Sequence, residues 1–169
     1  MLLSTSTYFL FLAGVFLLYW PLSQRRAAAL AVILFANYFF LARWHIAAVA
    51  VIPVASTIDY FLGQGLARAT GTLSRRLLVA ASIVLNVDLI VFLRYMPFLL
   101  ASWAGATGGQ AKAWPWVLPI SVSFYAFQSL TYTIDLYRRD ASPTSSYLAY
   151  LSAASFFPTV LSGPITRVS

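Results

Sequence analysis

Six apolar segments, each near the length of a membrane-crossing helix, follow one another along this chain of 169 residues. An α-helix rises about 1.5 Å per residue, so about 20 apolar residues cross a hydrocarbon core of about 30 Å. The sequence therefore predicts an all-α, polytopic transmembrane helix bundle with about six membrane segments. Their predicted bounds are 7–22, 27–44, 46–66, 77–103, 116–137 and 147–165.

The composition supports a membrane protein. Hydrophobic residues make up 61% of the chain and charged residues only 9%, which is too little charge to cover the surface of a soluble domain. The net charge of +7 would suit a nucleic-acid partner if it formed one patch. The basic residues instead lie in the gaps between apolar segments, so we expect no nucleic-acid partner. The chain has no cysteine, which excludes disulfides, thiol catalysis and cysteine-ligated metals.

The basic residues of the loops predict an orientation, because cytoplasmic loops carry an excess of Lys and Arg. The first, third and fifth loops hold seven of them, whereas the second and fourth loops hold only Arg43 and Lys112. The N-terminus is therefore predicted to lie outside, in an integral protein of a bacterial inner (plasma) membrane. The opening segment lacks the basic start and the cleavage site of a signal peptide, so we expect it to be a retained first span.

The sixth segment is predicted to be broken or re-entrant. Pro158, Gly163 and Pro164 interrupt it. Such residues free backbone amides and carbonyls, which is tolerated at membrane depth only where protein or water satisfies them.

Ionisable side chains within a span usually face the bundle interior or a water-filled cavity, because facing lipid costs several kcal/mol. Asp59 lies in the third segment with Ser56 one turn before it. Asn86 and Arg94 of the fourth segment are about 80° apart on a helix and could line one side. Arg94 could equally extend to the headgroups. Asp88 has no evident role.

Polar residues recur along the fifth segment with helical spacing. At 100° per residue they share an arc of about 100°, which should face other helices or a cavity. Hydrogen bonding between helices and cavity lining both remain open for each residue. The stripe contains Ser121, Phe124, Gln128, Thr131, Tyr132 and Asp135.

The stretch LPISVSFYAFQSLTYTIDLYRRD and the later SFFPTVLSGPITR resemble the signature region of the membrane-bound O-acyltransferase family, and of its bacterial branch most closely. That branch includes the alginate O-acetylation acyltransferases and the D-alanyl transfer protein of teichoic-acid modification. Ser121 departs from the family pattern, where Gly is usual, and Asp88 stands where a small or apolar residue is expected. The matching residues are Leu118, Pro119, Ser123, Phe124, Tyr125, Phe127, Gln128, Tyr132, Asp135, Tyr137, Arg138, Phe156, Phe157, Pro158, Gly163, Pro164, Ile165 and Arg167.

The resemblance implies transfer of an acyl group, by preference acetyl, from a thioester donor to a hydroxyl of a cell-envelope or exported polysaccharide. The family's histidine base lies beyond the matched region, so the resemblance predicts that residues 1–169 form an incomplete, N-terminal transmembrane part that is inactive alone. His45, the only histidine, is expected to be an interfacial residue, and no catalytic residue is nominated. We expect no bound cofactor and no metal. The implied partners are membrane lipid, the missing catalytic part, acyl-carrier proteins and polysaccharide-modification proteins.

Two alternatives stay open. The chain could be a non-enzymatic membrane scaffold or a degenerate remnant of the enzyme. It could also be a small channel or transporter, because Asp59, Asp88 and Asp135 all lie at predicted membrane depth.

Overall fold

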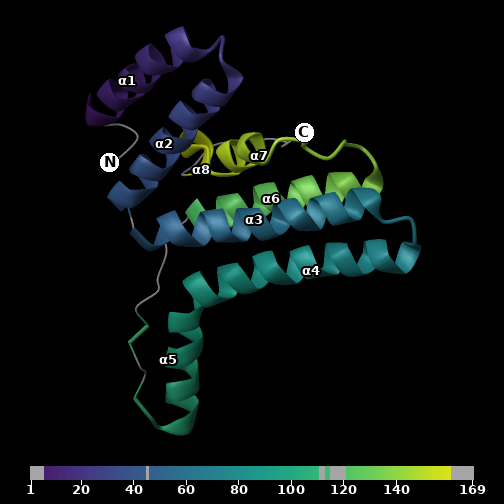
Figure 1. Ribbon diagram of the computed structural model, residues 1–169. Coiled ribbons are helices and arrows are strands. Elements are labelled where there is room, and N and C mark those ends of the chain that lie inside the picture. The colour runs from purple at the N-terminus through teal and green to yellow at the C-terminus, as the bar shows by residue number, and fades with distance from the viewer. Residues whose placement is uncertain (1–5, 45, 111–112, 115–120, 161–169) are drawn as a thin grey trace.

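The computed structural model describes residues 6–44, 46–110, 113–114 and 121–160, and this part of the chain is helical, without strands (Figure 1). The predicted all-α architecture is confirmed. In chain order the elements are α1 (Ser6–Leu22), α2 (Arg26–Trp44), α3 (Ile46–Arg68), α4 (Thr72–Ile90), the π-helical turn η1 (Val91–Tyr95), α5 (Met96–Thr107), α6 (Ser121–Arg138), α7 (Tyr147–Ala154) and α8 (Phe157–Val160).

Three helical stretches of the described residues are long and apolar enough to cross a membrane. They are Arg26–Arg43, Val49–Arg68 and Thr72–Thr107, and α1 is a shorter apolar helix of 17 residues. The length and composition of these helices make the chain an integral membrane protein.

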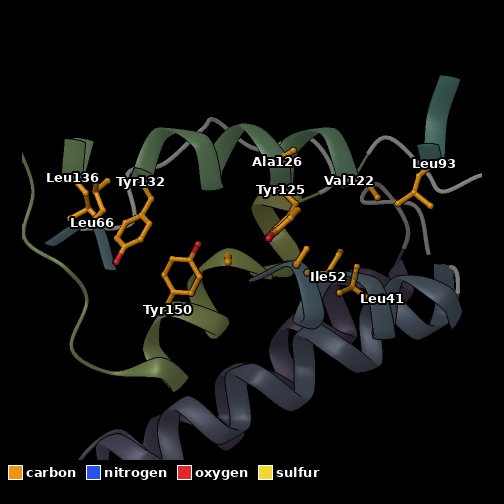
Figure 2. Close-up of a cluster of buried hydrophobic side chains, with 12 residues drawn as sticks. Leu41, Ile52, Leu66, Leu93, Val122, Tyr125, Ala126, Tyr132, Leu136 and Tyr150 are labelled. Atoms are coloured by element: carbon orange, nitrogen blue, oxygen red, sulfur yellow. The ribbon is translucent and has the colours of Figure 1, made fainter. Parts of the chain in front are cut away.

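Helices α3, α4 and α6 pack against one another and form the centre of the bundle. They run side by side in Figure 1, with α7 against α2 and α3. Figure 2 shows Tyr125 and Tyr132 projecting from α6 toward the side where Tyr150 of α7 lies. The core therefore joins segments that are far apart in sequence. Its largest members include Leu41, Ile52, Leu66, Tyr125, Tyr132 and Tyr150.

The fourth predicted segment, 77–103, is not one straight helix. The helix begins earlier, at Thr72, and α5 leaves α4 at a steep angle after η1 (Figure 1). Pro97 lies in the first turn of α5. Proline has no N–H for the carbonyl four residues earlier, that of Leu93, and its ring crowds that carbonyl, so the chain widens and bends. The stretch Thr72–Thr107 is one apolar helical stretch, in agreement with the prediction of one segment, but the prediction did not include the bend at Pro97.

The last segment is interrupted, as predicted. Helix α7 has 8 residues and α8 has 4, with the break at Ser155 and Phe156. Pro158 lies in α8 and has no N–H to bond the carbonyl of Ala154, the residue at which α7 ends. The predicted breaks at Gly163 and Pro164 lie outside the described residues.

Candidate functional site

The carboxylate of Asp59 lies at the centre of the α3, α4 and α6 packing and is fully buried. From α4, the Ser82 hydroxyl donates to it at 2.9 Å and the Asn86 amide donates to both oxygens at 3.0 and 3.1 Å. From α6, the Tyr125 hydroxyl donates at 3.1 Å and the Ser129 hydroxyl donates as well. Four side chains from two helices therefore converge on one carboxylate of a third.

The spacing of these donors explains why they meet. Residues four apart lie on one face of a helix. Ser82 and Asn86 have this spacing on α4, and Tyr125, Ser129 and Thr133 have it on α6. Thr133 shares a hydrogen bond of 3.0 Å with Ser82, so the two faces also contact each other directly.

The Asp59 carboxylate forms no ion pair with any residue that the structure describes. A buried carboxylate is tolerated when several donors replace the water that it loses, and the four donors supply that replacement. Ser129 also shares a hydrogen bond of 3.3 Å with the hydroxyl of Tyr150, which extends the network to α7. Since the carboxylate is fully buried and surrounded by donors, its arrangement suits holding helices in register rather than contacting a substrate.

A second polar centre lies at the end of the bundle where α3 and α6 finish. The guanidinium of Arg75, in the first turn of α4, donates to the carbonyl oxygens of Leu66 at 2.8 Å, Leu136 at 3.1 Å and Tyr137 at 2.7 Å. The last carbonyls of a helix lack partners within it and carry partial negative charge. One buried arginine thus caps two helices and fixes the start of a third.

The Arg75 contacts bring the ends of α3 and α6 together with the start of α4. Basic residues of the third and fifth predicted loops therefore gather at this end of the bundle. A pocket of about 330 Å³ opens there, lined in part by Thr70, Arg75, Arg139 and Ser142. The basic residues at this end are Arg68, Arg75, Arg76, Arg138 and Arg139.

The third polar centre is Asn37 of α2, which is fully buried at the break between α7 and α8. Its amide nitrogen donates to the carbonyl of Ser152 at 2.9 Å and to the hydroxyl of Ser155 at 3.2 Å. Its amide oxygen accepts from the backbone N–H of Phe157 at 3.0 Å. One side chain therefore satisfies backbone groups on both sides of the break, which allows the interruption to be buried.

The predicted polar stripe of α6 coincides only in part with the buried face of this helix. Gln128, Tyr132 and Asp135 are buried, whereas Phe124 and Thr131 are only half-buried. The Gln128 amide donates to the carbonyl of Ala153 at 3.2 Å, and the Tyr132 hydroxyl accepts from the N–H of Thr144 at 3.3 Å. The side chain of Ser121 lies outside the described residues.

The centre of that buried face was missed by the sequence reasoning. Tyr125, Ser129 and Thr133 occupy it, although Ser129 and Thr133 were not singled out and Tyr125 was noted only for the resemblance. Their spacing of four residues was the available signal, since it repeats a hydroxyl along one face.

Asn86 and Arg94 do not share one side of the fourth segment. Asn86 is buried against Asp59, whereas Arg94 is exposed within the widened turn η1. Arg94 lines a pocket of about 230 Å³ together with Tyr95, Ser123, Phe124 and Phe127. The bend in this segment changes the angular spacing that a straight helix would give, and the expectation that the two residues could line one side fails.

Among the residues described, no group of three His, Cys, Asp or Glu side chains is placed to hold a metal ion. His45 lies outside the described residues. The described polar centres therefore contain no pair of a nucleophile and a histidine base.

Comparison with known proteins gives similarity over nearly the whole chain. It is 27% identical over 175 residues to the probable alginate O-acetylase AlgI of Pseudomonas syringae pv. tomato, covering 99% of this chain and 33% of that protein. It is 29% identical over 170 residues to the probable alginate O-acetylase AlgI of Azotobacter vinelandii, covering 96% of this chain and 34% of that protein.

A further relative acts on a different glycan according to its name. The chain is 24% identical over 158 residues to the peptidoglycan O-acetyltransferase of Helicobacter pylori, covering 79% of this chain and 30% of that protein. The chain thus spans about a third of the length of the curated relatives it matches. No family model matches the chain, and no solved structure matches it.

Proposed function

We propose that the chain belongs to the membrane-bound O-acyltransferase family, and that it forms a transmembrane part of an enzyme that transfers acetyl groups to hydroxyls of an exported or cell-envelope polysaccharide. The observation that carries the proposal is similarity over 96–99% of the chain to alginate O-acetylases. Acetyl transfer is preferred to D-alanyl transfer because the relatives are named for O-acetylation.

The chemistry itself is proposed to come from residues outside 1–169. An alcohol is a poor nucleophile until a positioned base removes its proton, and histidine does this near neutral pH. The chain has one histidine, His45, and the polar centres of the described bundle are committed to holding helices. Residues 1–169 alone are therefore proposed to be inactive. The acyl donor is proposed to be a thioester, delivered with the help of acyl-carrier or polysaccharide-modification proteins.

The three polar centres support a scaffolding role for this part. Asp59 fixes α3 against α4 and α6, Arg75 fixes the ends of α3 and α6, and Asn37 fixes the broken segment. A reaction that joins a donor to an acceptor needs groups held within a fraction of an ångström of their productive positions. We propose that the described bundle, held by these three polar centres, forms one rigid side of the reaction site.

We further propose that the end with the gathered arginines lies in the cytoplasm. Helices α3 and α6 finish there and α4 begins there, as the Arg75 contacts require. The excess of basic residues at cytoplasmic ends supports this orientation. If α1, α2 and α3 each cross the membrane, the N-terminus lies outside, in a bacterial inner membrane.

The channel alternative is disfavoured by the positions of the aspartates. Asp59 is buried among donors, Asp88 is exposed on the other side of α4, and Asp135 is buried near the end of α6. These three residues do not line one pathway. The degenerate-remnant alternative makes a different prediction, since it requires no change in acetylation when the chain is removed.

The test is to delete the gene that encodes the chain and to measure acetate released by mild alkali from the envelope and exported glycans. The expected result is loss of ester-linked acetate, restored by the full gene product and not by residues 1–169 alone. Unchanged acetate would refute the acetyltransferase function. Restoration by residues 1–169 alone would instead refute the claim that the chemistry lies outside them.

A further inference from the structure

Asp88 lies on the side of α4 that faces away from the bundle. Asn86, two residues earlier, is buried against Asp59, and two residues turn a helix by about 200°. Asp88 is accordingly exposed. Its neighbours on that side are exposed apolar residues, among them Leu77, Val84 and Val87.

The depth of Asp88 in the membrane follows from the same contact. Asp59 lies near the middle of the 23-residue helix α3, so the amide of Asn86 that bonds it also lies near mid-depth. Asp88 is only about 3 Å further along the α4 axis. A carboxylate thus stands near the middle of the bilayer on an outer, apolar face.

Among the described residues, no hydrogen bond or ion pair to the side-chain carboxylate of Asp88 is present. A charged side chain that faced acyl chains at this depth would cost several kcal/mol, so such residues usually face a partner or a water-filled space. The Asp88 carboxylate at this depth therefore calls for a partner, and a basic side chain is the partner that would also balance its charge.

An apolar groove lies beside Asp88. It encloses about 340 Å³ between α3 and α4, and Leu85, which lines it, is one helical turn before Asp88 on the same side of α4. Small residues along a groove let the backbone of another helix approach closely. The lining residues are Ala50, Val51, Val54, Ala55, Ile58, Leu85 and Leu89.

A second copy of this chain does not fit the face. Copies in one membrane share their orientation, so Asp88 of one copy meets residues at its own depth in the other. Arg76, the basic residue on the exposed part of α4, lies 12 residues or about 18 Å away along the axis. Arg94 lines a pocket with Ser123 and Phe124 of α6. Two copies would bring carboxylate to carboxylate.

We propose that the α3–α4 groove and the outer face of α4 hold a transmembrane helix from outside residues 1–169, and that this helix carries an arginine or lysine that pairs with Asp88. The groove provides apolar contact along the partner helix. The Asp88 carboxylate pairs with the basic residue of that helix and so sets the depth at which this residue lies in the membrane. This proposal does not depend on which acyl group or glycan the protein uses.

The test places a photo-crosslinking amino acid, p-benzoylphenylalanine, at Val54 or Val84 of the full gene product in intact cell membranes. After irradiation, mass spectrometry maps the crosslinked peptide. The expected product from both positions is an apolar helix that contains Arg or Lys. Leu10, exposed on α1, is the matched control position and should not give this product.

Charge dependence is tested in the Val84 background. Asp88→Leu should lower the crosslink yield at least about fivefold, because removal of one partner leaves the other charge buried and unpaired. Asp88→Glu should retain most of the yield. Asp140→Leu is the control, since Asp140 pairs with Arg138 in the exposed loop after α6. The Asp88 side chain is exposed and its carboxylate forms no hydrogen bond or ion pair with the described residues, so its variants should remain folded.

Several outcomes would overturn the proposal. They are crosslinking only to lipid, crosslinking to α4 of a second copy, crosslinking to a helix without a basic residue, and a yield that Asp88→Leu does not change.

Discussion

The side-chain amide nitrogen of Asn86 lies 3.1 and 3.0 Å from the two carboxylate oxygens of Asp59, so a single amide binds both oxygens of a buried charge. Ser82, Tyr125 and Ser129 complete the set of donors. The stability of the α3, α4 and α6 bundle should therefore depend on the acceptor capacity of residue 59.

Replacing Asp59 by Asn should destabilise the bundle. An asparagine keeps one acceptor oxygen and presents an NH₂ group to side chains that also donate, so at least one buried donor loses its partner. The expected loss is about 2 kcal/mol of unfolding free energy. Denaturant titration in detergent micelles, followed by helical circular dichroism, measures it. Asp140→Asn in the exposed loop should change little, and equal stability of the two variants would contradict the prediction.

Replacing Arg75 by Lys should also destabilise the bundle, although it preserves the charge. The guanidinium reaches carbonyls of α3 and α6 at once, whereas an ammonium is a compact charge that cannot span both sets. Loss of one or two charge-assisted hydrogen bonds corresponds to about 2–4 kcal/mol. The same titration measures the change. Arg76→Lys, on the exposed side of α4, is the control and should not change the midpoint of denaturation.

Replacing Asn37 by Leu should loosen the junction between α7 and α8. The N–H of Phe157 would lose the Asn37 acceptor, and the carbonyl of Ser152 would lose its donor. The amide hydrogen of Phe157 should exchange at least about tenfold faster in deuterated buffer, which corresponds to about 1.4 kcal/mol of local opening. Gln64→Leu removes a side-chain amide bonded to Thr144 instead and should leave this amide unaffected. An unchanged rate in Asn37→Leu would rule out the bridging role.

Replacing Gly63 by Ala should lower stability despite the better helix propensity of alanine. A Cβ at Gly63 would lie 2.7 Å from a ring carbon of Tyr132 and 3.1 Å from a methyl carbon of Leu136, and both side chains are buried. Overpacking costs about 1–3 kcal/mol, against a gain of about 1 kcal/mol from propensity. Gly14→Ala is matched, because nothing lies within 4 Å of its Cβ. Gly14→Ala should leave the stability unchanged or raise it. The same result for Gly63→Ala would contradict the prediction, because it would mean that α3 and α6 leave room for a methyl group at Gly63.

Much of the fold follows from the sequence because a lipid environment restricts the options. Apolar segments of the right length must satisfy their own backbone groups, so helices were predictable, and Pro158 made the interruption of the last segment predictable. The bend at Pro97 was predictable in principle, since it rests on a local clash. The length of the apolar segment, by contrast, does not reveal this bend.

The site could be predicted only in part. Asp59 and Asn86 stood out because polar residues in an apolar span need partners. Ser129 gave no comparable signal, since a serine is common in helices that pack closely. The basic side chain of Arg75 predicts only the orientation in the membrane, because a loop sequence does not reveal that this side chain is buried.

The sequence by itself determined the membrane location, the helices and the need for polar contacts at depth, because these depend on local length, hydropathy and backbone hydrogen bonding. The tertiary structure decided which groups meet: Asp59 with donors of α4 and α6, Arg75 with the ends of two helices, and Asn37 with the broken segment. Helical periodicity orders residues around one axis. The partners across a contact depend on how separate axes are placed, and packing of the whole bundle sets that placement.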